Sequence, residues 1–463
     1  MDFSNCLFIF IFFPISCVLF YLTPKKFKKC SLLLISLIFL AISSWKSLIV
    51  ILASTLLSYV IGLMIEKYHK KSILVLGITL NVLLLVFFKY INFIFANINE
   101  IFSTQIKSLK LMLPLGISFF TFQIISYLVD VYKKKINAEK NIIKYLLYIC
   151  FFPRVLQGPI VRYEEFKKNI DEYKTPNLEE TVNGLKRICF GLGKVVILSN
   201  TMGNIWNEIY SANVSALTAW LGIICYSLYL YLNFSGYIDI SLGIGRIFGI
   251  QLPENFNYPY VSSSISEFWR RWHISLSSWF KDYVYIPLGG NRVGKAKHIR
   301  NIVVVWLLTG IWHGASWNFV IWGAMFGGIL LIEKFFLGKY LEKAPNFIKR
   351  LYVLFIVMVS FIIFNANNMG EAITNIAGLF GANGESFINK FTIYNLRSYA
   401  IILIIGIIGA TPIPKNFIQK LQQKPKTKRA INLLEPVYIA VLLIVVTAYL
   451  VDNSYNPFLY FRF

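Results

Sequence analysis

Three of the four histidines in this 463-residue chain lie between Ser264 and Gly314, and one of them, His313, has a strongly apolar setting. As a helix, the mostly apolar run after Arg300 would place His313 roughly 20 Å from that charged boundary, past the middle of a hydrocarbon core about 30 Å thick. An ionisable ring at that depth is costly and by default marks a functional site. A structural histidine satisfied by a neighbouring hydroxyl is the alternative. As a general base, this imidazole could take a proton from a substrate, and Gly314 would let a ligand approach the backbone closely.

The second histidine, His273, is predicted to lie on an amphipathic helix that begins near Ser264. Ser264 and Glu267 have the spacing of a capping box, and an aromatic stripe follows at helical spacing: Trp269, Trp272, Leu276, Trp279 and Tyr283. Arg270 and its charged neighbours form a polar flank. One interpretation is an interfacial helix whose tryptophans anchor at headgroup depth. The other is a helix that presents His273, one turn from Trp269 and Arg270, to a site.

The composition indicates a polytopic helical membrane protein. The chain is 57% hydrophobic, 17% aromatic and only 15% charged. Its net charge of +24 could suggest a nucleic-acid partner. However, Lys and Arg fall in short runs between apolar segments, as they do in cytoplasmic loops. We therefore predict an all-α membrane protein that binds no nucleic acid.

Apolar runs and basic clusters together predict the topology. The run Cys6 to Leu22 has its lysines after it, so we interpret it as a retained span with the amino end outside rather than a cleaved signal peptide. Basic loops, including the one at about 251–300, are predicted to be cytoplasmic, and the weakly charged 365–398 stretch to be an outer loop. The further predicted runs lie at about 30–45, 47–65, 72–88, 111–131, 216–250, 316–332, 352–364, 399–412 and 437–451.

Two regions depart from simple spans. From about 133 to 190, short apolar pieces lie among Lys, Arg and Pro, which favours re-entrant or interfacial elements, with a kinked interfacial loop as the alternative. Polar residues interrupt the 216–250 run, and a buried polar group needs a partner. Asp239 could pair with Arg246 at i+7 or could orient a histidine, and the sequence leaves both open.

Other candidate features have ordinary explanations. Gly289 to Arg292 with Lys295 and Lys297 could hold the phosphates of a donor, but a glycine turn beside a basic membrane surface is favoured. The six cysteines are scattered without metal-type spacing, so we predict no metal site. His69 and His298 lie in Lys-rich or Arg-rich segments and are predicted to be solvated loop residues.

Two segments of the chain resemble one known protein family. The stretches SISEFWRRWHISLSSWFKDYVYIPLGGNR (264–292) and TGIWHGASWNFVIWG (309–323) resemble the membrane-bound O-acyltransferase family, in its bacterial alginate O-acetyltransferase branch. The resemblance covers roughly residues 110–330, through PLGISFFTFQ (114–123), the Phe152-Pro153 to Arg162 segment and NFSGYID (233–239). The closing NPFLYFRF is also similar. Family members commonly carry Asp where this chain has Asn233, which puts a carboxylate role there in doubt.

The resemblance implies a fold of about 10–12 spanning helices, with re-entrant elements around a central tunnel. It implies one membrane-embedded acyltransferase domain over 1–463, with N-terminal spans in 6–131 and C-terminal spans in about 316–451. It further implies that His313 is the general base and that His273 positions the acyl group or donates a hydrogen bond. The remaining candidate tunnel or substrate residues are Trp312, Trp269, Arg270, Asp239, Asn233, Gln123, Pro153 and Arg162.

Acyl transfer from a thioester to a hydroxyl needs a base, an oxyanion donor and exclusion of water. The resemblance implies acetyl transfer in the bacterial cytoplasmic membrane from acetyl-coenzyme A, with no tightly bound cofactor. The acceptor would be an extracytoplasmic polysaccharide or the serine of a hydrolase-like partner acetyltransferase. One alternative is D-alanyl transfer to teichoic acid from a carrier-protein thioester. A second is a non-enzymatic transporter for a polysaccharide or lipid-linked sugar.

Overall fold

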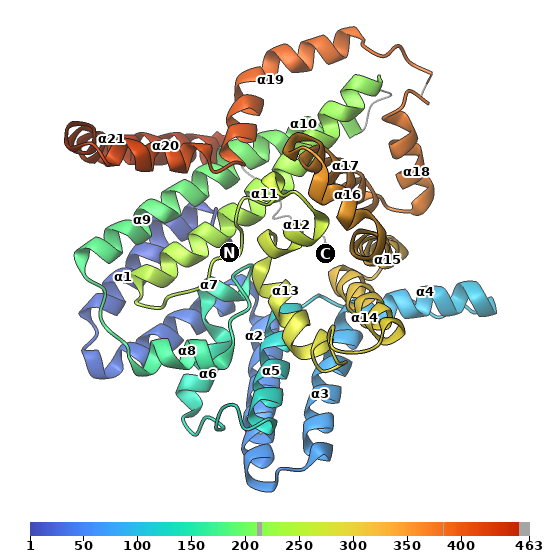
Figure 1. Cartoon of the computed structure of the whole chain (residues 1–463). Coiled ribbons are helices and arrows are strands. Elements are labelled where there is room, and N and C mark those ends of the chain that lie inside the picture. The colour runs from blue at the N-terminus through green and yellow to red at the C-terminus, as the bar shows by residue number, and fades with distance from the viewer. Residues whose placement is uncertain (211–214, 383, 453–463) are drawn as a thin grey trace. The chain divides into compact units, whose positions relative to one another are not determined.

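The chain folds into helices joined by short connections (Figure 1). The computed structural model describes residues 1–210, 215–382 and 384–452, and within these ranges no strand is present. The closing segment NPFLYFRF lies outside the described residues. The α-helices are α1 (Phe13–Leu22), α2 (Lys28–Tyr68), α3 (Lys71–Leu85), α4 (Ile91–Phe102), α5 (Ile117–Tyr132), α6 (Ile142–Cys150), α7 (Phe152–Val155), α8 (Tyr163–Asp171), α9 (Leu178–Leu192), α10 (Asn200–Tyr210), α11 (Ala216–Ile247), α12 (Ile265–Arg271), α13 (Ile274–Phe280), α14 (Lys295–His313), α15 (Trp317–Ile332), α16 (Gly338–Lys343), α17 (Asn346–Asn365), α18 (Met369–Gly378), α19 (Lys390–Gly409), α20 (Ile413–Gln422) and α21 (Pro425–Asp452).

The all-α polytopic class is confirmed. Within the described ranges, eight helical segments are long and apolar enough to cross a membrane: Lys25–Tyr68, Lys71–Phe102, Leu178–Tyr210, Ala216–Ile247, Trp317–Lys343, Asn346–Asn365, Lys390–Gly409 and Pro425–Asp452. Two shorter apolar helical segments, Phe8–Leu22 and Ile117–Tyr132, coincide with further predicted runs. The predicted runs at 30–45 and 47–65 are the two halves of α2, which meet at the non-helical Ser44. This pattern is that of a multi-pass membrane protein.

The sequence did not predict one of the spanning segments. Leu178–Tyr210 is long and apolar enough to cross a membrane, yet charged side chains such as Arg187 hid it within the broken pattern predicted for 133–190. The guanidinium of Arg187 donates to Oδ1 of Asp239 on α11, from Nε at 2.9 Å and from Nη2 at 2.8 Å. Because the charge is paired inside the protein, it does not prevent the helix from being buried.

The chain forms two compact units, each assembled from separate stretches. Unit 1 consists of residues 1–188, 238–254 and 278–287, and unit 2 of residues 189–237, 255–277 and 288–463. The boundaries therefore cut α9, α11 and α13. That all of these residues act as one membrane-embedded domain remains a prediction.

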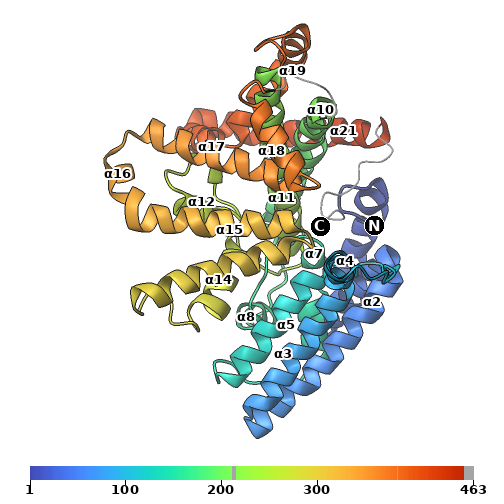
Figure 2. The ribbon, with the colours of Figure 1, turned by 90° about the vertical axis from the view of Figure 1, so that its right-hand side faces the viewer.

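Unit 1 is built on α2, α3, α5 and α6. Helices α2, α3 and α5 run side by side (Figures 1 and 2), and α6 packs against α2. Glycine allows the close approach of α2 to α5, since a Cβ on Gly62 would lie 2.7 Å from a ring carbon of Tyr127. Such contacts at small residues are typical of helix packing in membranes.

The short helices α6 and α7 lie inside unit 1. Tyr145, Tyr148, Phe152 and Arg154 on these helices are fully buried. Both helices are too short to cross a bilayer. Burial of these short helices agrees with the re-entrant interpretation, and the choice between it and a kinked interfacial loop stays a prediction.

Unit 2 holds an aromatic core around the pair α14 and α15, which lie side by side (Figure 2). These helices touch where a Cβ on Gly310 would lie 3.1 Å from the Cα of Gly323. Trp269, Trp306 and Trp322 pack together beside them, with ring centroids 4.8 to 6.3 Å apart. Trp269 and Trp272 are less than a tenth exposed, so the interpretation of these tryptophans as headgroup anchors was wrong.

Arg154 generates a prediction about stability. Its side chain is fully buried, all of its guanidinium nitrogens lack a hydrogen-bond partner among the described residues, and its charge lies over Tyr148 and Phe166. A buried charge without a paired group is costly. Replacing even a paired buried charge with an apolar side chain of similar volume can stabilise a protein by about 1–4 kcal/mol. We expect Arg154→Met to raise the thermal unfolding midpoint in detergent by a few degrees.

Arg162→Met is the matched comparison, because the guanidinium of Arg162 donates to Oδ2 of Asp282 at 3.0 Å. Removing that paired charge should lower the midpoint, as should any loss of one partner from a partly buried pair. Equal destabilisation by the two substitutions would show that Arg154 is paired in a way that the geometry does not reveal.

Candidate active site

His313 lies on a helix, as its apolar run predicted, and is the last residue of α14. Its half-buried imidazole stands among three aromatic rings at steep angles. The ring centroids of Trp312, Trp322 and Phe364 lie 4.9, 5.0 and 5.2 Å from that of His313. Helix α17 supplies Phe364 and α15 supplies Trp322, so three helices enclose the imidazole in an apolar cage.

Gly314 allows the start of α15 to pack closely against the end of α14. A Cβ at this position would lie 2.1 Å from a ring carbon of Phe319, so glycine is required for the first turn of α15 to fold back on the end of α14. The expectation that a ligand approaches this backbone was wrong, because a phenylalanine ring occupies that place. The consequence is a fixed end to α14 and a fixed position for His313.

His273 does not lie on a continuous helix. Helix α12 begins at Ser264, whose hydroxyl accepts from the Glu267 backbone N–H at 3.0 Å as predicted, although the Glu267 carboxylate accepts from Ser263. The helix ends at Arg271, and His273 then has a positive φ of 44° before α13 starts. The prediction of one helix through Trp269 and Tyr283 was therefore wrong, and His273 stands in a break between two helices.

A buried asparagine, Asn255, explains the break. Its backbone carbonyl accepts from the Ile274 N–H at 3.0 Å, and its side-chain oxygen accepts from the Ser275 N–H at 2.9 Å. These bonds satisfy the first N–H groups of α13, which would otherwise need residues of a preceding helical turn. The loop before α12 thus caps α13, and the strained His273 backbone is maintained by this cap.

The same side chain sets the tautomer of His273. Because Oδ1 of Asn255 accepts from Ser275, its Nδ2 is the nearer amide atom to Nδ1 of His273, at 3.2 Å against 3.4 Å for Oδ1, and we infer that Nδ2 donates to Nδ1. A neutral imidazole that accepts at Nδ1 carries its proton on Nε2. Burial lowers the pKa of His273 to about 3, so the neutral ring is favoured near pH 7 and offers its Nε2–H as a hydrogen-bond donor.

The structure brings four of the predicted residues together in unit 2. The ring of Trp312 lies 6.0 Å from His273 and 4.9 Å from His313, centroid to centroid. Trp269 packs against Trp322, and the ring of Trp322 packs in turn against His313. Arg270, by contrast, is exposed on α12 and lies outside this cluster.

Asn233 lies on α11 in unit 2 and is 4% exposed. Its side-chain oxygen lacks a hydrogen-bond partner among the described residues. The next residue, Phe234, packs its ring at 87° to the imidazole of His273, with centroids 4.9 Å apart. An amide rather than a carboxylate next to this contact adds no negative charge beside the buried ring.

The remaining candidates lie in unit 1. Gln123 on α5 is buried, Pro153 on α7 accepts through its carbonyl from Ser241 at 2.6 Å, and Arg162 binds Asp282. Asp239 pairs with Arg187 rather than with Arg246, and its role in orienting a histidine stays a prediction. The Gly289–Gly290 segment is a turn with two positive φ values, whose carbonyl at Gly290 accepts from Asn301 at 3.0 Å.

Sequence reasoning missed Asn255, Trp322 and Phe364 as site residues. Trp322 belongs to the 309–323 motif, but nothing in the pattern distinguished it from the other tryptophans. Phe364 and Asn255 approach their histidines from 51 and 18 residues away in sequence, beyond any local periodicity. Only a tertiary contact identifies them.

The arrangement suits proton transfer near a developing negative charge. The cluster offers two imidazoles close to one indole, one partly exposed and the other held as a neutral Nε2–H donor. A base and a preorganised donor are two of the elements that acyl transfer requires. The surrounding aromatic rings are apolar, which favours exclusion of water, the third element.

The cap at His273 yields a prediction. In Asn255→Asp, a carboxylate would replace the amide that donates to Nδ1, so Nδ1 must become protonated to restore the hydrogen bond. We expect the ¹⁵N signal of His273 Nδ1 to change from the unprotonated to the protonated position at pH 7 in a chain with only four histidines. The exposed Asn257→Asp change in the same loop is the control and should leave the signal unchanged. An unaltered Nδ1 signal in Asn255→Asp would contradict the tautomer assignment.

The chain is similar to a known protein family and to several of its members. The family described as MBOAT, membrane-bound O-acyltransferase family, matches residues 63–369. The chain is 33% identical to a probable alginate O-acetylase of Azotobacter vinelandii, over the full length of both proteins. It is 35% identical to a peptidoglycan O-acetyltransferase of Helicobacter pylori, covering 83% of this chain and 80% of that protein.

A more limited similarity links the chain to the D-alanyl transfer enzymes. It is 34% identical to a teichoic acid D-alanyltransferase of Bacillus subtilis over 48% of this chain and 59% of that protein. The family match covers well over half of the chain, and it includes both His273 and His313. This multi-pass membrane protein therefore belongs to the membrane-bound O-acyltransferase family and is an O-acyltransferase.

Proposed function

We propose that this chain transfers an acetyl group from cytoplasmic acetyl-coenzyme A to a hydroxyl outside the bacterial cytoplasmic membrane. The acceptor is a polysaccharide or the serine of a partner acetyltransferase. Similarity to O-acetyl transfer proteins over 83 to 100% of this chain supports the acetyl group, whereas the D-alanyltransferase similarity covers 48% of it. The membrane setting and the run of basic loops support the orientation.

The observation that carries the proposal is the pair of histidines around Trp312. In the proposed reaction, the His313 imidazole takes the proton of the acceptor hydroxyl as its oxygen attacks the thioester carbonyl. The Nε2–H of His273 donates to the carbonyl oxygen as negative charge develops there. The C–S bond breaks, an ester C–O bond forms, and the proton on His313 passes to the departing thiolate.

The other site residues have supporting roles in this proposal. Trp312, Trp269, Trp322 and Phe364 keep bulk water from the thioester and fix the ring of His313. Asn255 is a positioning residue, because it acts through His273. Gln123, Pro153, Arg162, Asn233 and Arg270 remain candidate tunnel residues, and Asp239 is assigned to the ion pair with Arg187.

The test uses purified protein in sealed vesicles, with radiolabelled acetyl-coenzyme A on the cytoplasmic side and an outer acceptor. We expect His313→Gln to lower transfer by about 100-fold or more, as is usual for loss of a general base. His273→Asn should mainly lower kcat, because a donor to the developing oxyanion acts in the transition state. His69→Asn is the control, since His69 is exposed and its positive φ is one that asparagine tolerates.

The outcomes separate the alternatives. Transfer by His313→Gln within twofold of the parent, at matched protein levels, would remove the general-base role. Consumption of a carrier-protein thioester but not of acetyl-coenzyme A would move the chain to D-alanyl transfer. Appearance of a sugar outside without loss of any thioester would favour the transporter.

A further inference from the structure

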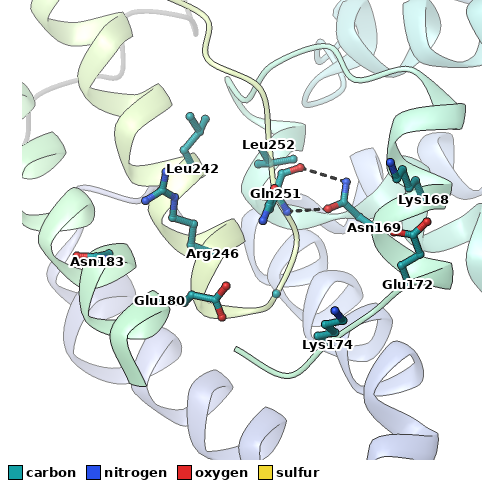
Figure 3. A pocket seen from close by; sticks show the side chains of 11 residues that line it. Lys168, Asn169, Glu172, Lys174, Glu180, Asn183, Leu242, Arg246, Gln251 and Leu252 are labelled. Carbon is teal, nitrogen blue, oxygen red and sulfur yellow. Dashed lines mark hydrogen bonds between the residues drawn. The ribbon is translucent and has the colours of Figure 1, made fainter. Parts of the chain in front are cut away.

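Unit 1 contains a polar pocket of about 640 Å³ that the catalytic proposal does not use (Figure 3). One side is formed by Lys168, Asn169 and Glu172 at the end of α8, and the other by the start of α9 and the end of α11, with Arg246. Lys174 closes one edge. The volume lies within the range of small-molecule sites, and the charged lining favours a polar ligand.

The cations of this pocket are not neutralised by neighbouring carboxylates. Arg246, Lys168 and Lys174 have no ion pair with any residue in the described ranges. Arg246 is available because Asp239, seven residues earlier on α11, is held by Arg187 instead. The pairing expected from the sequence would have neutralised it.

The two acidic residues of the lining do not offset these charges. The carboxylate of Glu180 accepts from the Asn177 N–H at 3.0 Å, while Asn177 accepts from the Glu180 N–H at 2.8 Å. This reciprocal cap commits Glu180 to the start of α9. Glu172 is exposed at the end of α8. The pocket lining therefore has three cationic side chains and one carboxylate, that of Glu172, which does not cap a helix.

The backbone around the pocket is firmly positioned. Helix α11 ends in a Schellman motif, in which Ile250 N–H donates to Gly245 at 2.8 Å and Gly249 N–H donates to Arg246 at 3.1 Å. Gly249 has a φ of 75°, and a Cβ there would lie 2.9 Å from the carbonyl oxygen of Lys174. Asn169 exchanges two hydrogen bonds with the backbone of Gln251, at 3.1 and 3.3 Å (Figure 3).

From this arrangement we propose that the pocket binds a phosphate-bearing ligand through Arg246, Lys168 and Lys174. Guanidinium and ammonium groups bind phosphate oxygens through charge-assisted hydrogen bonds. The side-chain amide of Asn169 is already bonded to the backbone of Gln251, so the cations supply the attraction for the ligand. The phosphate comes either from a soluble nucleotide-type compound or from the headgroup of an anionic lipid.

The experiment measures binding, so its result is independent of acetyl transfer. Thermal unfolding midpoints of the purified full chain are recorded at matched ionic strength with pyrophosphate, with coenzyme A, and in nanodiscs of phosphatidylglycerol or of phosphatidylcholine. We expect one phosphate source to raise the midpoint of the parent. Arg246→Gln should raise the concentration needed for half the effect by about tenfold.

Lys70→Gln is the control, because it removes one positive charge from an exposed residue of unit 1 outside the pocket. It should leave the response unchanged. A response to pyrophosphate or coenzyme A that depends on Arg246 supports a soluble ligand, and one seen only with phosphatidylglycerol supports a lipid headgroup. The proposal is overturned if no source gives such a response, or if Lys70→Gln weakens it as much as Arg246→Gln.

Discussion

A polar group inside this chain is stabilised by a partner within the protein, because the bilayer core offers none. Two pairings show how much of the structure depends on that constraint. Arg187 and Asp239 allow two charged helices to be buried in unit 1. In unit 2, Asn255 caps the interrupted helix that carries His273. Each pairing also decides the state of another residue, since the first leaves Arg246 unpaired and the second fixes the tautomer of His273.

Local signals predicted the features that local physics controls. The helix start at Ser264 followed from a hydroxyl that can cap the N–H three residues on. The helix that carries His313 followed from the apolar run after Arg300. The same reasoning predicted the polytopic class, because apolar runs of spanning length rarely occur for any other reason.

Features that depend on distant partners were missed or mistaken. The spacing from Trp269 to Tyr283 fits one helix, yet Asn255 stabilises a break at His273 from 18 residues away. Asp239 had a plausible partner at i+7, but Arg187 reaches it from 52 residues away with two hydrogen bonds. Gly314 suggested space for a ligand, and Phe319 fills that space. In each case periodicity identified a special residue but not what it contacts.

The two site histidines differ in ways that match the different roles proposed for them. A general base must gain and lose a proton in every cycle, so its ring needs access to substrate and must tolerate both charge states. His313 is half-buried at the carboxyl end of α14, where the helix dipole favours a transient positive charge. An oxyanion donor must not change its protonation, and His273 is buried with Nδ1 held by Asn255. The backbone elements that hold each ring thus give the same residue type two different roles. Exchanging these roles would require changes to both the α12–α13 break and the end of α14.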